Sequence, residues 1–352
     1  MDNHSYPSSP PAFECLLGVG AVDSFSAAAG HAFPDLKQWA ARQQDWVLGH
    51  LAYDLTAETE GVAGAFPDPI GFPDAFFFRP VHLILLQKDS VRIGSVQEDP
   101  AVLWQQICAT QPMLGQPMAA GGPAAPVPAA AANPAAPVPA AAAPAPPAES
   151  STDPVPAADG RPAAPAPAPA NPIQFTPRFT REEYLSTVEA LRRHILRGDC
   201  YEINFCQEFF AQPAAIDPYA TWWALSQASP NPFAAFYRLD DRYLLCASPE
   251  RFLKKTGATL FSQPIKGTAP RQKQDPLSDR RGQEELYNSA KDRAENVMVV
   301  DLVRNDLSRI CEPGSVRVSE LFGIYPFPQV YQMISTIKGT ILPGLDWTDA
   351  VR

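Results

Sequence analysis

The sequence predicts an α+β protein in which mixed, mainly antiparallel sheets carry flanking helices. Aromatic and β-branched residues gather in short runs that occur in pairs, such as residues 233–237 and 242–247, with a few polar residues between them. Helix-length segments that start at capping residues, such as Thr180 and Ser289, lie between these pairs. Strands and helices do not alternate regularly, which argues against a repeated βαβ unit.

Composition divides the 352 residues into three parts. Residues 117–172 are dominated by Ala and Pro, and the segment 123–132 recurs unchanged at 134–143. Such a stretch has too few large apolar side chains to offset its ordering entropy. We therefore predict an N-terminal α/β segment at 1–116, a disordered tether at 117–172 and a core at 173–352. A ligand for a proline-binding domain is the alternative interpretation of the tether.

Charge and composition exclude several classes of protein. The net charge of −10 gives no nucleic-acid footprint, and no apolar run is long enough to cross a membrane. The first basic residue is Lys37, so the start of the chain lacks the charged region of a secretory signal. The six cysteines are scattered without CxxC spacing, which indicates a reduced, cytoplasmic protein without a zinc site. Only His194 follows the tether, so chemistry there cannot depend heavily on imidazole.

Local patterns predict the individual elements. Before the tether, apolar spacing predicts a helix over 35–50, and aromatic and β-branched runs predict strands at 75–80 and 81–86. After it, the capping box at Thr180 opens a helix that ends at Gly198, and Ser289 opens another that ends near 313. The remaining prediction is a helix over 217–228, with strands at 201–210, 233–237, 242–247, 252–255, 259–263, 316–318, 321–325 and 333–341.

Lys266 is the strongest candidate for a catalytic residue. It lies between Pro264 and Gly267. Proline has a fixed φ, and glycine can adopt backbone conformations that are closed to other residues. We expect a turn that presents the amine in a defined direction. A lysine acts as a nucleophile only in its neutral form, and Arg271 is a candidate neighbour for it. A surface lysine in a Pro/Gly turn is the alternative.

Glu250 is the candidate acid. It follows a predicted strand, and the segments 252–255 and 259–263 can fold back as a hairpin. That hairpin would bring Glu250 and Lys266 to the same end of the sheet, where a carboxylate can exchange the proton that a departing hydroxyl needs. A salt bridge with Arg251 or Lys254 is the alternative role.

Asp292 and Glu295 are the candidate metal ligands. They are three residues apart on the helix that Ser289 opens, so they share a helix face. Magnesium takes oxygen ligands and obtains the rest of its shell from water and substrate. In the alternative interpretation, Asp292 only caps the helix and Glu295 pairs with Lys291.

Several longer motifs occur together in this sequence. They are Gly198-Asp199 with Asn204, and 248–252, 264–268, 291–296, 301–307 and 335–337 with Gly339. In these motifs the sequence resembles the chorismate-binding enzymes, well over 174–352 and loosely over 13–112. The resemblance implies a fold like that of anthranilate synthase component I.

Within that family, the lysine at position 266 is similar to that of the aminodeoxychorismate synthase component I group, whereas the anthranilate synthases have alanine. The resemblance implies that chorismate and ammonia are converted to 4-amino-4-deoxychorismate for folate synthesis. It implies Lys266 as nucleophile, Glu250 as acid and base, and Glu295 with Asp292 as Mg²⁺ ligands. Gly267, Thr268 and Gln332 are implied to bind substrate, and a separate glutamine amidotransferase subunit is implied to supply ammonia.

Two features depart from the family pattern. The family commonly has histidine at position 332, and Gln332 can hydrogen-bond substrate but cannot shuttle protons near neutral pH. The family pattern also continues past Arg352, so we expect a core incomplete at its C-terminus and impaired activity in this chain alone. The alternatives are anthranilate synthase component I and a non-catalytic scaffold for the glutaminase subunit.

Overall fold

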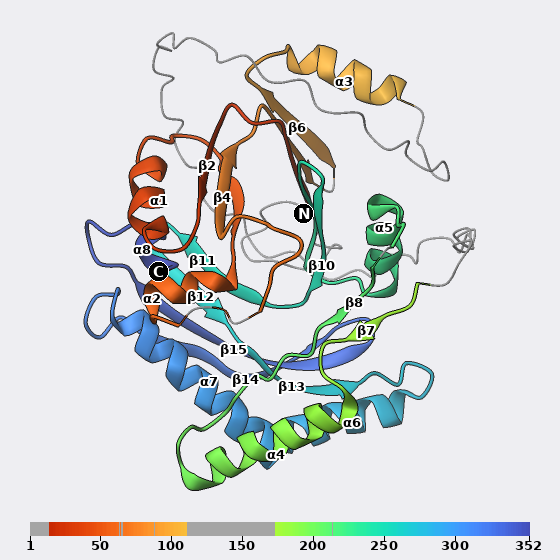
Figure 1. The fold of residues 1–352 in the computed structure, drawn as a ribbon, viewed down its shortest axis with the longest axis vertical. Coiled ribbons are helices and arrows are strands. Elements are labelled where there is room, and N and C mark those ends of the chain that lie inside the picture. The colour runs from red at the N-terminus through yellow and green to blue at the C-terminus, as the bar shows by residue number, and fades with distance from the viewer. Residues whose placement is uncertain (1–13, 63, 65, 88, 111–172, 213) are drawn as a thin grey trace, which may run out of the picture. The chain divides into compact units, whose positions relative to one another are not determined.

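A computed structural model describes residues 14–62, 64, 66–87, 89–110, 173–212 and 214–352, and the predicted tether at 117–172 lies outside them. The chain splits into two compact units, one formed by Met1–Pro112 with Pro218–Arg352 and one by Met113–Asp217. Figure 1 shows the elements of both. In the part of the chain that the structure describes, no helix is both long and apolar enough to cross a membrane.

The N-terminal part of the first unit contains two antiparallel three-stranded sheets. One has the order β1-β5-β6, formed by Cys15–Val19, His82–Gln87 and Ser90–Ser95. The other has the order β2-β4-β3, formed by Asp23–Ala27, Ala75–Arg79 and Leu48–Leu51. Helix α1 (Ala32–Ala40) packs on the second sheet and buries Phe33, Leu36 and Trp39 against Phe25 and Ala75. The other helices are a 3₁₀ turn at Tyr53–Leu55, α2 (Thr56–Thr59) and α3 (Pro100–Ala109).

The C-terminal part of the first unit contains the sheet that bears Lys266. Helix α5 (Pro218–Ala228) leads into the hairpin of β9 (Phe233–Leu239) and β10 (Arg242–Ser248). A five-stranded sheet follows, built from β11 (Arg251–Thr256), β12 (Thr259–Gln263), β13 (Ile265–Pro270), β14 (Arg317–Pro326) and β15 (Val330–Thr340). Helices α6 (Pro276–Asn288) and α7 (Ala290–Ser308) pack on this sheet (Figure 1). The short helix α8 (Trp347–Ala350) contacts α1.

The core beneath the five-stranded sheet forms because β15 alternates its side chains between two faces. Ile337 and Met333 are completely buried and point to the side of α6 and α7, where they meet Val300 and Leu286 respectively. Gln332, Ile334 and Thr336 lie on the opposite face of the strand. The helices therefore cover one face of the sheet, and the opposite face carries both polar side chains and the buried Ile334.

The second unit is described only over residues 173–212 and 214–217. Helix α4 (Arg181–Arg197) has the predicted capping box, in which the Thr180 hydroxyl accepts from the Glu183 amide and the Glu183 carboxylate accepts from the Thr180 amide. Gly198 ends the helix in the left-handed conformation, with φ of 86°. Strands β7 (Thr176–Pro177) and β8 (Phe209–Phe210) pair with each other.

The α+β class is confirmed, and several boundaries are wrong. The helix predicted over 35–50 spans Ala32–Ala40 instead, because residues 48–51 pair with β4 as a strand. Of the strand predicted at 201–210, only the last two residues belong to a sheet. Among the described residues, only these two pair with another strand, which is β7. The two strands predicted between 316 and 325 form one strand, β14, whose two register shifts interrupt its side-chain alternation.

Candidate active site

Lys266 lies at a β-bulge rather than in the predicted turn. Strands β12 and β13 run one after the other along the same edge of β15, with Pro264 between them and its carbonyl bonded to the Ser335 amide at 3.3 Å. The register with β15 shifts between Ile265 and Thr268, so Lys266 and Gly267 form the irregular step. Gly267 has φ of 103°, which other residues rarely adopt. A bulge of this kind changes the direction of a side chain and often occurs beside active sites.

The structure brings Glu250 to the backbone next to Lys266. Glu250 precedes β11, and β11 folds back on β12 as the sequence predicted, although the register shifts after Arg251. One carboxylate oxygen of Glu250 accepts a hydrogen bond of 3.1 Å from the amide of Ile265. Glu250 is exposed and Lys266 is partly buried. The Glu250 carboxylate therefore contacts the residue that precedes Lys266, at the start of β13.

Thr268 and Gln332 face each other across β13 and β15. They are register partners, and the Thr268 hydroxyl donates to the Gln332 side-chain oxygen at 2.6 Å. Both were predicted to bind substrate. The hydroxyl proton of Thr268 is therefore already donated to Gln332. The side-chain NH₂ of Gln332 remains as the group of this pair that could donate to a ligand.

Asp292 and Glu295 both make the local contacts of the alternative interpretation. The Ser289 hydroxyl donates to an Asp292 carboxylate oxygen at 2.5 Å, and Glu295 pairs with Lys291 at 3.3 Å. The first turn of α7 nevertheless lies against the bulge, because a Cβ placed on Gly267 would lie 3.0 Å from that of Asp292. The sheet residue next to Lys266 and the helix that carries both acids are thus in direct contact.

Two carboxylates on one helix are only part of a metal site. Among the described residues, no group of three His, Cys, Asp or Glu side chains is placed to hold a metal ion. The donor chemistry fits Mg²⁺, which often takes one or two carboxylates and completes its shell with water and substrate oxygens. The Lys291 side chain of the ion pair with Glu295 is exposed, so the pair contributes little stability. A metal cation could therefore replace Lys291 as the partner of Glu295 at a small cost in free energy.

Asn296 and Ser335 form a buried polar network that the sequence alone does not reveal. The Asn296 amide nitrogen donates to the carbonyls of Lys266 and Met333 at 3.3 and 3.4 Å, and its oxygen accepts from the Ser335 hydroxyl at 2.5 Å. Ser335 in turn accepts from the amide of Phe322 at 3.1 Å, where the backbone has φ of 61°. Asn296 is 1 % exposed and Ser335 is fully buried. The network ties α7 and three strands together directly at the bulge. The signal that could have indicated this network is an Asn inside a predicted helix, directly after the candidate metal ligand Glu295.

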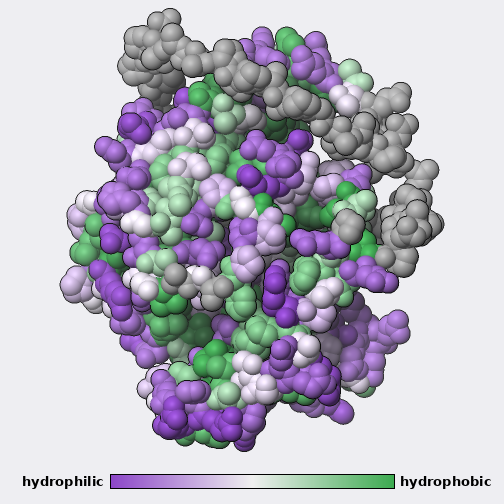
Figure 2. Space-filling model, in the orientation of Figure 1, coloured by the Kyte–Doolittle hydropathy of each residue, from purple (hydrophilic) through white to green (hydrophobic). Residues whose placement is uncertain are grey.

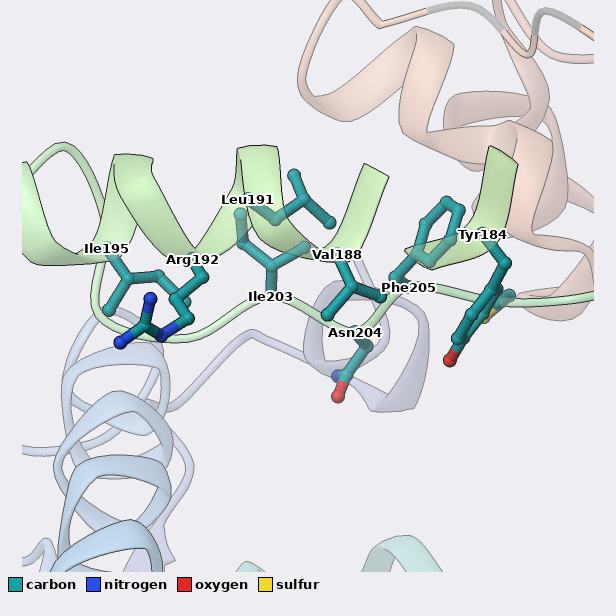
Figure 3. Close-up of a pocket in the computed structure, with 9 residues that line it drawn as sticks. Tyr184, Val188, Leu191, Arg192, Ile195, Ile203, Asn204 and Phe205 are labelled. Atoms are coloured by element: carbon teal, nitrogen blue, oxygen red, sulfur yellow. The ribbon is translucent and has the colours of Figure 1, made fainter. Parts of the chain in front are cut away.

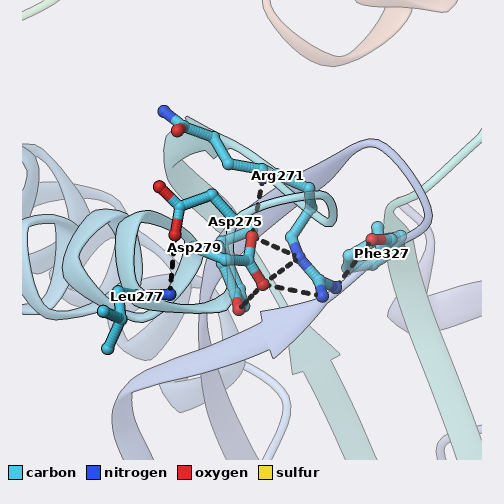
Figure 4. Close-up of polar contacts among 7 residues, drawn as sticks. Arg271, Asp275, Leu277, Asp279 and Phe327 are labelled. Carbon is cyan, nitrogen blue, oxygen red and sulfur yellow. Dashed lines mark hydrogen bonds and ion pairs between the residues drawn. The ribbon is translucent and has the colours of Figure 1, made fainter.

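Arg271 pairs with Asp279. Among the described residues, no contact joins Arg271 to the amine of Lys266. Its guanidinium binds the carboxylate at 2.9–3.1 Å and lies 4.5 Å above the Tyr331 ring, whose hydroxyl donates to Asp279 at 2.8 Å (Figure 4). The hydrogen bonds from Arg271 lower the pKa of Asp279 to about 2. This network fixes the end of β13 to the start of α6 and to β15.

This network should make stability depend on pH in acid. The pKa of Asp279 is lower in the folded chain than its ordinary value of 3.8, so its contribution is complete above about pH 4 and is lost as pH falls towards 2. We expect Asp279→Asn to melt several degrees lower than the wild type at pH 7. The difference in melting temperature should shrink between pH 4 and pH 2, and a difference that stays constant down to pH 2 would contradict the assignment.

Gly267 should be intolerant of a side chain. Gly267→Ala places a Cβ 3.0–3.3 Å from Asp292, Met333 and Leu286 at a strained φ, so we expect unfolding free energy to fall by about 2–4 kcal/mol. Gly257→Ala is the matched control, because φ is also positive there but no atom lies within 4 Å. It should cost about 1 kcal/mol. Urea denaturation measures both, and equal losses would mean that the bulge is not crowded.

The second unit contains an apolar pocket of about 570 Å³. It lies between α4 and the segment 203–206 (Figure 3). Phe205 packs on Phe179 and Tyr184. Asn204, part of the resemblance, lines it and is the one pocket residue that the sequence motifs include. None of the predicted catalytic or metal-binding residues belongs to this pocket.

Comparison with known proteins relates the chain to one family. The family model described as "chorismate binding enzyme" matches residues 3–352. Relatives named "Aminodeoxychorismate synthase component 1" match about half the chain: that of Klebsiella aerogenes is 43% identical over 173 residues, and that of Bacillus subtilis is 33% identical over 178. These matches cover 49% and 51% of this chain, and 38% and 37% of the relatives.

Anthranilate synthases are also similar. "Anthranilate synthase component 1" of Thermus thermophilus is 27% identical over 307 residues, which covers 87% of this chain and 57% of the relative. Among solved structures, anthranilate synthase component I from Streptococcus pneumoniae superposes with a TM-score of 0.70 at 19% identity, over 98% of this chain and 73% of that one. That likeness shows the fold.

Proposed function

The chain belongs to the family of chorismate-binding enzymes, and we propose that within it the chain is an aminodeoxychorismate synthase component I. The observation that carries the proposal is Lys266 itself. It stands at a bulge where the absence of a side chain on Gly267 leaves room for Asp292, and its carbonyl accepts from the buried Asn296. Glu250 is bonded to the preceding amide. Relatives that carry the name of this activity match about half of the chain, which supports the proposal.

The proposed reaction exchanges the 4-hydroxyl of chorismate for an amino group in two steps. The neutral amine of Lys266 forms a bond to C2, both ring double bonds shift by one position, and the bond from C4 to the hydroxyl breaks. Glu250 supplies the proton with which the hydroxyl leaves as water. Ammonia then forms a bond to C4, both double bonds shift back, and the bond from C2 to Lys266 breaks. The proton that the new C4 ammonium group releases returns to Glu250.

The remaining residues would position the substrate. The amide NH₂ of Gln332, held by Thr268, can donate to a substrate oxygen, and Gly267 leaves room for Asp292 to lie against the bulge. Asp292 and Glu295 would hold Mg²⁺ together with substrate and water oxygens, and the ion would offset the charge of a chorismate carboxylate.

The ammonia source and location are also proposals. The words "component 1" in the names of the relatives support a separate glutamine amidotransferase subunit as the source of ammonia. All six cysteines are free in the structure, which supports the predicted cytoplasmic location.

Anthranilate synthase is the second candidate, because a relative of that name matches 87% of the chain. The product separates the two. We expect the protein, with Mg²⁺ present, to convert chorismate and ammonium to 4-amino-4-deoxychorismate, identified by chromatography and mass spectrometry. Fluorescent anthranilate as the main product would overturn the proposal.

A further inference from the structure

A polar pocket of about 470 Å³ lies where α1 ends, far along the chain from the five-stranded sheet. It is lined by Asp23, Arg42, Gln43, Gln44 and Arg79. The pocket belongs to the first unit, and none of its residues takes part in the proposed reaction. Its formal charge is positive, with two arginines against one aspartate.

Asp23 is the natural partner of Arg79 but does not pair with it. The two are register partners in β2 and β4, a position where opposite charges usually attract each other. One oxygen of Asp23 instead accepts from the Trp39 indole at 2.9 Å and from the Gln43 amide at 2.8 Å. The acid therefore ties β2 to α1 and to the turn after it.

Arg79 is left with a buried, unused donor. Its Nε is inaccessible to solvent and has no hydrogen-bond partner among the described residues. A buried donor without an acceptor costs roughly 1–3 kcal/mol, more when it is charged, and an anion bound at the terminal nitrogens of this guanidinium would offset part of its charge. The guanidinium is a planar fork that binds carboxylate or phosphate oxygens in pairs.

The rest of the pocket is suited to an anion. Backbone bonds from Arg42 to Trp39 and from Gln43 to Ala40 hold the turn that carries Arg42 and both glutamines. These bonds also use carbonyls at the end of α1 that would otherwise repel an anion. We propose that this pocket binds a small molecule through a phosphate or carboxylate group, with Arg79 and Arg42 as the two cations that hold it.

Titration of the full 352-residue chain tests this site. We expect saturable binding of inorganic phosphate or of malonate in isothermal titration calorimetry, at constant ionic strength balanced with potassium chloride. The tighter of the two probes identifies the anionic group. Arg79→Gln and Arg42→Ala should each weaken binding at least about tenfold, since each removes a charge-assisted contact.

Two further variants sharpen the test. Asp23→Asn keeps an oxygen for Trp39 and Gln43 but removes a negative charge, so binding should tighten several-fold. Arg92→Ala removes an exposed arginine of β6 and should leave affinity unchanged. The proposal is overturned if neither probe saturates, or if Arg79→Gln and Arg92→Ala bind alike. If Arg79→Gln lacks a folded circular dichroism spectrum, Arg42→Ala and Asp23→Asn decide the question by the same criterion.

Discussion

Replacement of Lys266 by alanine should lower formation of 4-amino-4-deoxychorismate by at least about 100-fold, because the covalent route through C2 then has no nucleophile. The substitution removes only the side chain. The contact of the lysine carbonyl with Asn296 and the bond from the Ile265 amide to Glu250 both remain. The melting temperature should therefore change little, and the loss should appear in kcat. Initial rates of product formation with saturating chorismate and ammonium measure the effect.

Two other lysine variants separate nucleophilic chemistry from charge and from general damage. Lys266→Arg keeps a positive charge but not an amine that can become neutral, so it should be nearly as inactive as the alanine variant. Lys255→Ala, at an exposed lysine of β11 that bonds the Gly257 carbonyl, should keep full activity. Activity in Lys266→Arg close to the wild type would show that the residue acts only as a cation.

The second large effect is expected at Asn296. Asn296→Ala leaves the Ser335 hydroxyl and the carbonyls of Lys266 and Met333 without their buried partner, so unfolding free energy should fall by about 2–4 kcal/mol. It should also loosen the bulge, so that turnover falls about tenfold or more even where the protein is fully folded. Urea denaturation and steady-state kinetics on the same samples measure both effects.

Val300→Ala is the matched control for Asn296. It lies four residues further along α7, is 5% exposed and packs in the core beneath the sheet. It should cost about 2 kcal/mol of stability and leave turnover within about twofold of the wild type. If both variants lost turnover equally at equal stability, Asn296 would serve only the fold and would not position Lys266.

Local signals in the sequence predicted local structure well. The helices that begin at Thr180 and Ser289 form because each cap needs only the first turn that follows it. The same kind of signal was present and unused at Asp275, whose side chain accepts from the amides of Leu277 and Ser278 and opens α6 with Pro276 in its first turn.

Long-range features could not be predicted in this way. The bulge at Lys266 depends on register with β15, more than 60 residues further along the chain, and Pro264 and Gly267 alone fit a turn as well. The alternation at 201–210 likewise gave no information on whether a partner strand existed. A pairing signal that tests each strand against its partner, rather than each strand alone, would be needed for both.

The sequence predicted the part of the candidate site that a hairpin brings together. It did not predict the part that depends on how a helix packs on the sheet. The fold-back of β11 on β12 brought Glu250 to Ile265, as local pattern suggested. The contact between Gly267 and Asp292 and the buried pair of Asn296 and Ser335 depend on how α7 lies on the sheet. Sequence motifs named those residues without assigning them to one another.

The most direct test of the central claim is to look for the covalent bond at Lys266. The active protein would be incubated with chorismate and Mg²⁺ in the absence of ammonia, quenched in acid and digested for peptide mass spectrometry. We predict that the peptide containing Lys266 gains the mass of chorismate less one water, and that Lys266→Ala gains nothing. An unmodified lysine in a preparation that makes 4-amino-4-deoxychorismate once ammonia is added would contradict the account.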